Sequence, residues 1–186
     1  MANALSINYD GVTNCIVTDV EITNPFTGEK TGASGIWDTG ATNSAITEKM
    51  ARQLNLVPIS KCDVMGVHGI NTVNIYTVIV SLNNKQITVN INVTEAKKLS
   101  ANDDIGMLIG MDIITMGDFC VTNTGGKTSM SFIRPSQKRI DFVEDINKYN
   151  EMLKKHNFQL TQGNNKCPCG SGKKWENCHG KIIFKD

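Results

Sequence analysis

Residues 36–41 read Ile-Trp-Asp-Thr-Gly-Ala, an apolar strand that runs into an Asp-Thr-Gly turn at 38–40. A lone tripeptide of this kind is compatible with an ordinary turn in which Asp38 accepts hydrogen bonds from backbone N–H groups. The sequence further along the chain favours a functional role for Asp38 instead. Residues 108–110 read Leu-Ile-Gly and continue into Met-Asp-Ile-Ile, and the segment between the two motifs contains Val-Met-Gly-Val-His-Gly at 64–69.

The sequence around these motifs predicts a domain built mainly of strands. Two turn signals, Asn-Asn-Lys at 83–85 and Asn-Thr-Gly-Gly at 123–126, join neighbouring segments into hairpins. Thr47 precedes a helical pattern that runs to Leu56, and we expect Thr47 to cap that short helix. A helical turn is expected at 111–116. The segments rich in β-branched and aromatic residues are 6–10, 15–23, 73–82, 86–93, 118–122 and 128–134.

The order and spacing of these motifs resemble those of the retropepsin-like aspartic proteases. The resemblance spans about residues 12–134 and implies a mainly β domain, the closed retropepsin-like barrel of the acid-protease half-fold. It also implies that Leu-Ile-Gly at 108–110 braces the catalytic loop, and we interpret Asp112 beside it as structural. The implied catalytic loop is Asp38, Thr39 and Gly40, and the implied substrate-binding flap is Gly66, Val67, His68 and Gly69.

The chemistry of this family requires two carboxylates that share one proton, because like charges in contact cannot both ionise. The chain has one Asp-Thr-Gly sequence, so a working site needs Asp38 from each of two chains. A two-fold symmetric dimer brings two such copies together. The resulting prediction is a homodimeric aspartic endopeptidase that hydrolyses peptide or protein substrates. The alternative is a dimer that binds peptides without cleaving them.

Composition narrows the remaining choices. With 40% hydrophobic and 20% charged residues, the chain is neither disordered nor fibrous. No apolar run reaches the ~18 residues of a membrane span, and the first residues do not resemble a signal peptide, so we expect a cytoplasmic protein without a membrane partner. The net charge of +1 excludes a globally basic nucleic-acid binder. Residues 1–134 carry a net charge of −3 and residues 135–186 a net charge of +4, which indicates two different parts.

The six cysteines divide in the same way. Cys15, Cys62 and Cys120 are scattered, and we expect them to be reduced, buried thiols. The other three fall within residues 167–179, which read Cys-Pro-Cys-Gly-Ser-Gly-Lys-Lys-Trp-Glu-Asn-Cys-His. Three thiolates and one imidazole suit tetrahedral zinc, and so small a segment would draw its folding energy from the metal. The predicted ligands of one structural Zn²⁺ per chain are Cys167, Cys169, Cys178 and His179.

This cysteine segment closely resembles the SEC-C module over about residues 166–181. The resemblance implies a zinc knuckle that docks substrate, a partner protein or the ribosome. Nucleic acid is not the expected partner, although a basic tail that tethers the chain to nucleic acid is a third interpretation. If the chain does not cleave peptides, the zinc module becomes its functional interaction element.

An amphipathic helix is predicted between the two parts. Apolar residues recur at three- and four-residue steps from Ile140 to Leu153 in a stretch that opens at Pro135. Its apolar stripe could pack on the barrel, form a dimer contact or hold the tail at a distance. The expected organisation is therefore a protease domain at 1–134, a helical linker at 135–160 and a zinc-binding module at 161–186.

Overall fold

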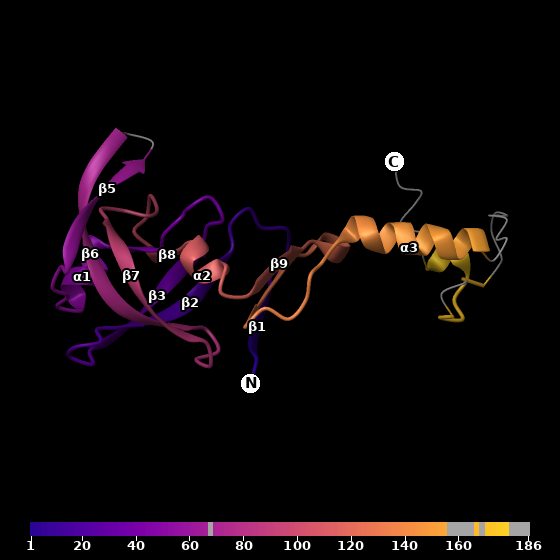
Figure 1. The fold of residues 1–186 in the computed structure, drawn as a ribbon, viewed down its shortest axis with the longest axis horizontal. Coiled ribbons are helices and arrows are strands. Elements are labelled where there is room, and N and C mark those ends of the chain that lie inside the picture. Colours follow the sequence, from indigo (N-terminus) through magenta and orange to yellow (C-terminus); the bar gives the residue numbers. More distant parts are fainter. Residues whose placement is uncertain (67–68, 156–165, 168–169, 179–186) are drawn as a thin grey trace. The chain divides into compact units, whose positions relative to one another are not determined.

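A computed structural model of the chain separates into two compact units, Met1–Lys138 and Arg139–Asp186. It describes residues 1–66, 69–155, 166–167 and 170–178. The first unit consists of strands with two short helices, and Figure 1 shows its strands curving around one another. Among the described residues, no helix is both long enough and apolar enough to cross a membrane.

Seven strands of the first unit form one sheet that closes into a barrel. Closure occurs because β2 pairs with β3 on one side and with β6 on the other, so the order around the barrel is β2, β3, β8, β4, β7, β6. Among the described strands, β5 has β6 as its single partner, and the two project together as an arm (Figure 1). The strands are β2 Val17–Thr23, β3 Lys30–Trp37, β4 Ala45–Thr47, β5 Ser60–Gly66, β6 Gly69–Leu82, β7 Thr88–Ala96 and β8 Ile105–Ile109.

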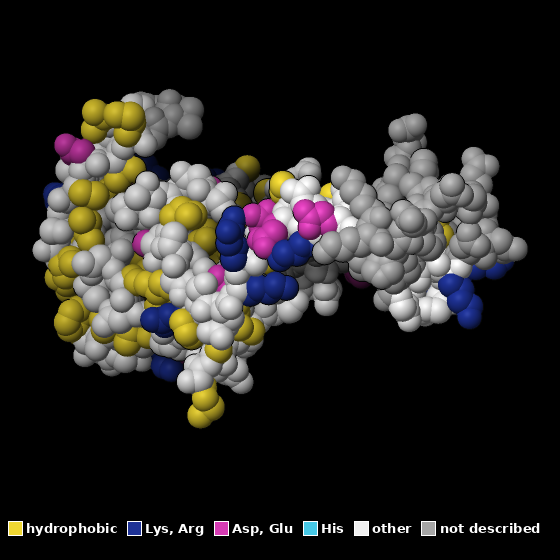
Figure 2. All heavy atoms as spheres, turned by 45° about the vertical axis from the view of Figure 1, so that its right-hand side comes forward, with side chains coloured by type: hydrophobic (Ala, Val, Ile, Leu, Met, Phe, Trp, Pro, Cys, Tyr) yellow, Lys and Arg dark blue, Asp and Glu magenta, His cyan; other side chains and the backbone are white. Residues whose placement is uncertain are grey.

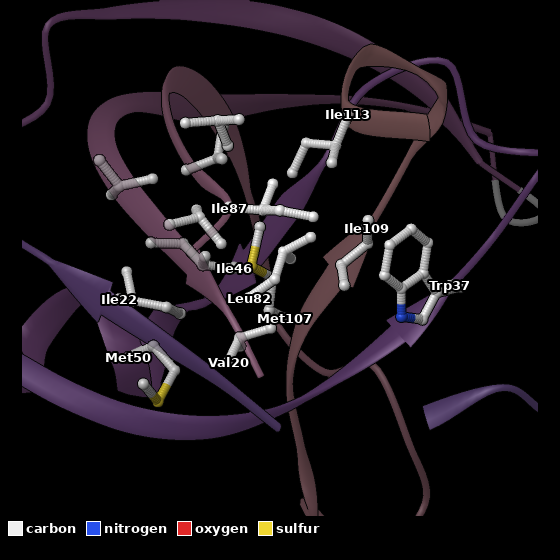
Figure 3. Packing of buried hydrophobic residues seen from close by; sticks show 14 of the residues in the cluster. Val20, Ile22, Trp37, Ile46, Met50, Leu82, Ile87, Met107, Ile109 and Ile113 are labelled. Atoms are coloured by element: carbon white, nitrogen blue, oxygen red, sulfur yellow. The ribbon is translucent and has the colours of Figure 1, made fainter. Parts of the chain in front are cut away.

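Most neighbouring strands of the barrel are antiparallel, but β3–β8 and β4–β7 are parallel pairs. Alternate side chains of each strand point inward, which is why the interior of a small barrel fills with side chains. Ile22, Val78 and Met107 are fully buried there, and Figure 3 shows residues of this cluster pointing toward one another from different strands. The buried core therefore holds β3 and β8 rigidly side by side.

The short helix α1, Glu48–Gln53, begins where the sequence predicts. The side chain of Thr47 accepts a hydrogen bond from the N–H of Met50, so Thr47 is the N-cap as expected. Met50 and Ala51 are buried against the barrel. The second predicted helical turn is also present as α2, Met111–Ile114.

A second, three-stranded sheet joins the two ends of the first unit. Its strands are β1 Asn3–Asn8, β10 Ser129–Arg134 and β9 Asp118–Thr122, with β10 in the middle. β1 pairs with β10 along its whole length, from Asn3↔Arg134 to Asn8↔Ser129. β9 and β10 form the predicted hairpin, whose connection contains the 3₁₀ turn η1, Thr124–Gly126. The Phe119 ring of β9 stacks on Trp37 at the end of β3, with ring centroids 5.2 Å apart.

At the end of the first unit, the carboxylate of Asp118 binds the segment that follows β10. This carboxylate accepts hydrogen bonds from Ser136 Oγ at 2.5 Å and from the N–H groups of Gln137 and Lys138 at 2.6 and 2.9 Å. These donors, with the Ser136 hydroxyl first, lower the pKa of Asp118. The segment after Pro135 is thereby held in a turn.

The long helix α3, Phe142–Lys155, accordingly begins later than the stretch from Pro135 that the sequence suggested. Asp141 Oδ1 accepts hydrogen bonds from the N–H groups of Val143 and Glu144, both at 3.1 Å, and so caps its first turn. Within the second unit, the Tyr149 ring stacks on Trp175 of the 3₁₀ turn η2, Trp175–Asn177.

The expectation of buried thiols is wrong for the three scattered cysteines. Cys15 is exposed because it lies in the loop before β2. Cys62 and Cys120 are half-buried because they lie on the projecting arm and on the edge strand β9. None of the three forms a disulfide.

Candidate active site and cysteine module

Asp38 lies at the end of β3, at the first residue after the parallel pair Trp37↔Ile109. Its backbone N–H donates a 2.9 Å hydrogen bond to the carbonyl of Ile109, which continues the ladder by one step. The segment 38–41, called the elbow here, then turns away from the sheet. The Asp38 side chain is half-buried, while Thr39 and Gly40 are exposed.

A backbone donor faces the Asp38 carboxylate. The N–H of Gly40 donates a 2.8 Å hydrogen bond to Asp38 Oδ1, which fixes the orientation of the carboxyl group. A Cβ added to Gly40 would lie 3.2 Å from the same oxygen, so glycine leaves the space that this contact needs. The arrangement presents an oriented acid at an exposed turn, as a general acid or base requires.

Asp112 of α2 binds Ser44, which follows the elbow in the chain. Its Oδ2 accepts a 2.8 Å hydrogen bond from the N–H of Ser44, and its Oδ1 accepts bonds from Ser44 Oγ at 2.6 Å and from the N–H of Ile113 at 2.9 Å. Each carboxylate oxygen of Asp112 thus has a donor within its own domain. These contacts agree with the structural interpretation of Asp112.

The segment 110–113 is called the brace here. It lies closest to the residues after the elbow at Gly110. The N–H of Gly110 donates to Ser44 Oγ at 3.0 Å, and the N–H of Met111 donates to the carbonyl of Ala41 at 2.8 Å. A Cβ on Gly110 would lie 2.6 Å from the carbonyl carbon of Asn43, a distance that real contacts essentially never show. Glycine is required here because backbone packs directly on backbone.

The predicted flap lies on the arm formed by β5 and β6. Gly66 pairs with Gly69 in the last described pair of this hairpin, and Val67 and His68 lie outside the described residues. Figure 2 shows hydrophobic side chains gathered near the projecting end of the arm. The exposed ones on β5 and β6 are Val64, Met65 and Ile70. The described part of the arm therefore exposes apolar side chains on both of its strands.

The cysteine module contains a tight hairpin. Lys166 and Lys174 form an antiparallel bridge, and the N–H of Cys167 donates to the carbonyl of Lys173 at 2.6 Å. Gly170 and Gly172 have φ values of 78° and 71°, a backbone conformation that favours glycine. The turn allows a cysteine before it and a cysteine after it to belong to one compact site.

Two of the four predicted zinc ligands belong to the described part of this module. Cys167 is buried, and Cys178 is half-buried with its Sγ 3.5 Å from Ser171 Oγ. Cys169 and His179 lie outside the described residues, and within the part that is described no three potential ligands form a metal cluster. A buried thiol next to a glycine-rich hairpin is compatible with structural zinc, which prefers thiolate and imidazole donors.

The elbow, the arm and the brace all fall within one match to a family model. The model described as aspartyl protease matches residues 25–113. The match covers 89 of the 186 residues, just under half of the chain. The closed strand order of the matched domain agrees with the expected fold class, and a mainly β chain with a retropepsin-like barrel is confirmed. A second model, the SEC-C motif, matches residues 164–181, in agreement with the resemblance of residues 166–181 to that module.

The chain is also similar to solved structures. A retropepsin-like aspartic protease from Rickettsia conorii is 14% identical over 72% of this chain and 94% of its own, with a TM-score of 0.46. The Simian Foamy Virus (mac) protease is 18% identical over 53% of this chain and 91% of its own, with a TM-score of 0.38. The EIAV protease in complex with the inhibitor HBY-793 is 22% identical over 57% of this chain and 89% of its own, with a TM-score of 0.39.

These TM-scores are below 0.5, so the fold class rests on the strand order and on the match to the family model. No curated protein matches the chain significantly.

Proposed function

We propose that the chain is a homodimeric aspartic endopeptidase in which Asp38 of two protomers forms the catalytic pair. The observation that carries the proposal is the elbow, where Asp38 is fixed at the end of β3 by Ile109 and its carboxylate is oriented by the N–H of Gly40. The match of residues 25–113 to the aspartyl protease family supports the same chemistry.

In the proposed mechanism, one Asp38 carboxylate of the pair is ionised and the other is protonated. The ionised group accepts a proton from a water molecule as the water attacks the scissile carbonyl carbon. The protonated group donates a hydrogen bond to the carbonyl oxygen and so stabilises the charge that develops there. Thr39 and Gly40 complete the loop, and the flap proposed from the sequence, Gly66, Val67, His68 and Gly69, would cover the substrate.

The dimer surface that we propose is the open edge of β9. Among the described strands, β9 pairs only with β10, so its other edge is available to a second copy. Its Phe119 stacks on Trp37, the residue before Asp38, so the edge strand is anchored directly beside the elbow. Val121 on this strand is 40% exposed. Antiparallel pairing of β9 with its symmetry mate would bring two elbows toward the same axis.

The cysteine module is proposed to be an adaptor that holds one structural zinc ion through Cys167, Cys169, Cys178 and His179. Four protein ligands close a zinc site, so the ion would stabilise the fold of the module and would perform no catalysis. The module would dock substrate, a partner protein or the ribosome, and its exposed Lys166, Lys173 and Lys174 suit an acidic surface. Reduced thiolates fit a reducing compartment, which is why we propose a cytoplasmic location.

The test is cleavage of an unfolded protein by the purified chain and by the Asp38→Asn variant. Asparagine has nearly the same shape but cannot ionise, so the variant should fold normally and lose activity. Equal cleavage by both proteins would refute the proposal. Peptide binding by both proteins without cleavage would instead favour the non-catalytic peptide-binding dimer.

A further inference from the structure

The arm that carries the proposed flap leaves the barrel at one defined residue of β6. From Ile75 to Ser81, β6 pairs with β7, and from Gly69 to Ile75 it pairs with β5. Ile75 is therefore the root of the arm, because beyond it β6 has lost its partner in the barrel. The position of the flap depends on how firmly β6 is held at this point.

A cluster of three side chains holds the strand on both sides of the root. Asn74 and Tyr76 flank Ile75, and alternation along a strand places both on the same face. Asn74 Nδ2 donates hydrogen bonds of 3.2 Å to both carboxylate oxygens of Glu95 on β7, and the Tyr76 hydroxyl donates a short hydrogen bond to Glu95 Oε2. The one carboxylate thus binds the last residue of the arm and the first residue inside the barrel.

The environment of this cluster makes its hydrogen bonds strong. Tyr76 is only 5% exposed. Burial, followed by the hydrogen bond to Glu95, raises the pKa of Tyr76 to about 12, so the hydroxyl keeps its proton and remains a donor at neutral pH. Hydrogen bonds to an ionised acceptor are roughly twice as strong as neutral ones.

The cluster is connected to the elbow through the neighbouring residue of β7. Thr94 pairs with Ile75, and its N–H donates a 3.1 Å hydrogen bond to the carbonyl of Ser44. Ser44 is the residue that Asp112 holds against Gly110. Two adjacent residues of β7 therefore bind the root of the arm and the segment that follows the elbow.

We infer that Glu95 is a positioning residue that sets the arm of β5 and β6 relative to Asp38 by clamping Asn74 and Tyr76 at the root of the arm. The inference rests on the proposed function, because the arm has a catalytic meaning only if Asp38 is catalytic. It adds to that function a residue that touches neither substrate nor the reacting groups.

The experiment compares wild type with Tyr76→Phe and Glu95→Gln by amide hydrogen exchange of the full chain without substrate. Tyr76→Phe removes one hydrogen bond and leaves the ring in the core, whereas Glu95→Gln keeps the size of the side chain and removes its charge. Exchange in residues 60–66 and 69–74 should become about tenfold faster in both variants, since a hydrogen bond to a charged group contributes on that scale. Exchange of the barrel strands β2 and β8 should stay unchanged.

Thr77→Val is the matched control. Thr77 Oγ1 donates a 2.8 Å hydrogen bond to Asn92 Oδ1 across the same two strands, inside the barrel segment of β6 and on the face opposite Asn74 and Tyr76, and its loss should leave exchange in the arm unchanged. Faster exchange throughout the barrel in the cluster variants, or no change in the arm, would overturn the inference. Because no substrate is used, this result is independent of whether the chain cleaves peptides. If it does, Tyr76→Phe should raise KM more than it lowers kcat.

Discussion

Ser44 Oγ donates a 2.6 Å hydrogen bond to Asp112 Oδ1 and accepts a 3.0 Å hydrogen bond from the N–H of Gly110. One fully buried hydroxyl thus joins the segment after the elbow to the segment before α2. The elbow is rigid because two parts of the sequence that are 66 residues apart are connected through this side chain.

Ser44→Ala should lower the free energy of unfolding by about 1–3 kcal/mol, because the variant leaves a buried N–H and a carboxylate oxygen each with one partner fewer. Denaturant unfolding measures this change. Ser81→Ala is the control, since Ser81 Oγ makes an exposed 3.2 Å contact with Thr88 Oγ1 and its loss should change stability little. Equal effects of the two substitutions would contradict the role assigned to Ser44.

Gly110→Ala should destabilise the domain and disturb the elbow, because the new Cβ would meet the backbone of Asn43. Overpacking of this kind typically costs about 1–3 kcal/mol. Gly32→Ala adds the same methyl group where nothing lies within 4 Å, and it should be nearly neutral. Thermal unfolding of both variants provides the measurement, and a neutral Gly110→Ala would show that the elbow and the brace are not in close contact.

Several parts of this architecture could be predicted because they depend on local sequence. The capped helix α1 and the hairpins β6–β7 and β9–β10 follow from residues close to one another in the chain. The motifs Asp-Thr-Gly and Leu-Ile-Gly are each contiguous in the sequence, so their resemblance to the family can be recognised without a structure. Their hydrogen-bond connection through Ile109 was expected only from the resemblance.

Other parts could not be predicted because they depend on distant contacts. Nothing in the sequence near Ser44 indicates that Asp112 binds it, and neither Glu95 nor Tyr76 lies in a recognisable motif. The start of α3 was placed too early because the apolar periodicity begins before the helix does, and the carboxylate of Asp118, on β9, holds residues 136–138 in a turn.

Val121→Lys should shift the protein toward monomers and lower its specific activity, because a lysine on an edge strand opposes pairing with a second copy. Val57→Lys is the control, since Val57 is 75% exposed in the segment between α1 and β5 and does not belong to β9. Analytical ultracentrifugation over a range of concentrations measures the effect. An unchanged dissociation constant in Val121→Lys would reject β9 as the dimer surface.

Zinc content should fall from one ion per chain to well below one in Cys167→Ser, because a buried thiolate ligand is lost. Cys62→Ser changes a half-buried thiol on the arm and should keep full zinc content. Elemental analysis of the purified proteins gives both values. Chelation should unfold the module and leave the barrel folded, which circular dichroism and exchange of the barrel amides can distinguish. Equal zinc contents in the two variants would remove Cys167 from the ligand set.

Asp118→Asn should destabilise the first unit at neutral pH and have less effect in acid. Folding lowers the pKa of Asp118 from its ordinary value of 3.8. The ionised carboxylate therefore stabilises the fold above pH 3.8, and this contribution is lost as the pH falls through the lowered pKa of the folded chain. Comparing the unfolding of wild type and variant from pH 7 down to pH 2 tests this. Asp10→Asn, an exposed aspartate in the loop after β1, is the control. If the difference in unfolding free energy between wild type and Asp118→Asn grew in acid, the stabilising role assigned to the ionised Asp118 carboxylate would be contradicted.

The pairing of β1 with β10 has a consequence for the order of events during synthesis. β1 has its partner β10 more than 120 residues later in the chain, and the elbow needs Ile109 before it can take shape. A nascent chain that has exposed Asp38 therefore lacks both its brace and its closing sheet. Such a chain should be unable to cleave neighbouring nascent proteins, because the proposed active site can form only after β8 and β10 have been synthesised.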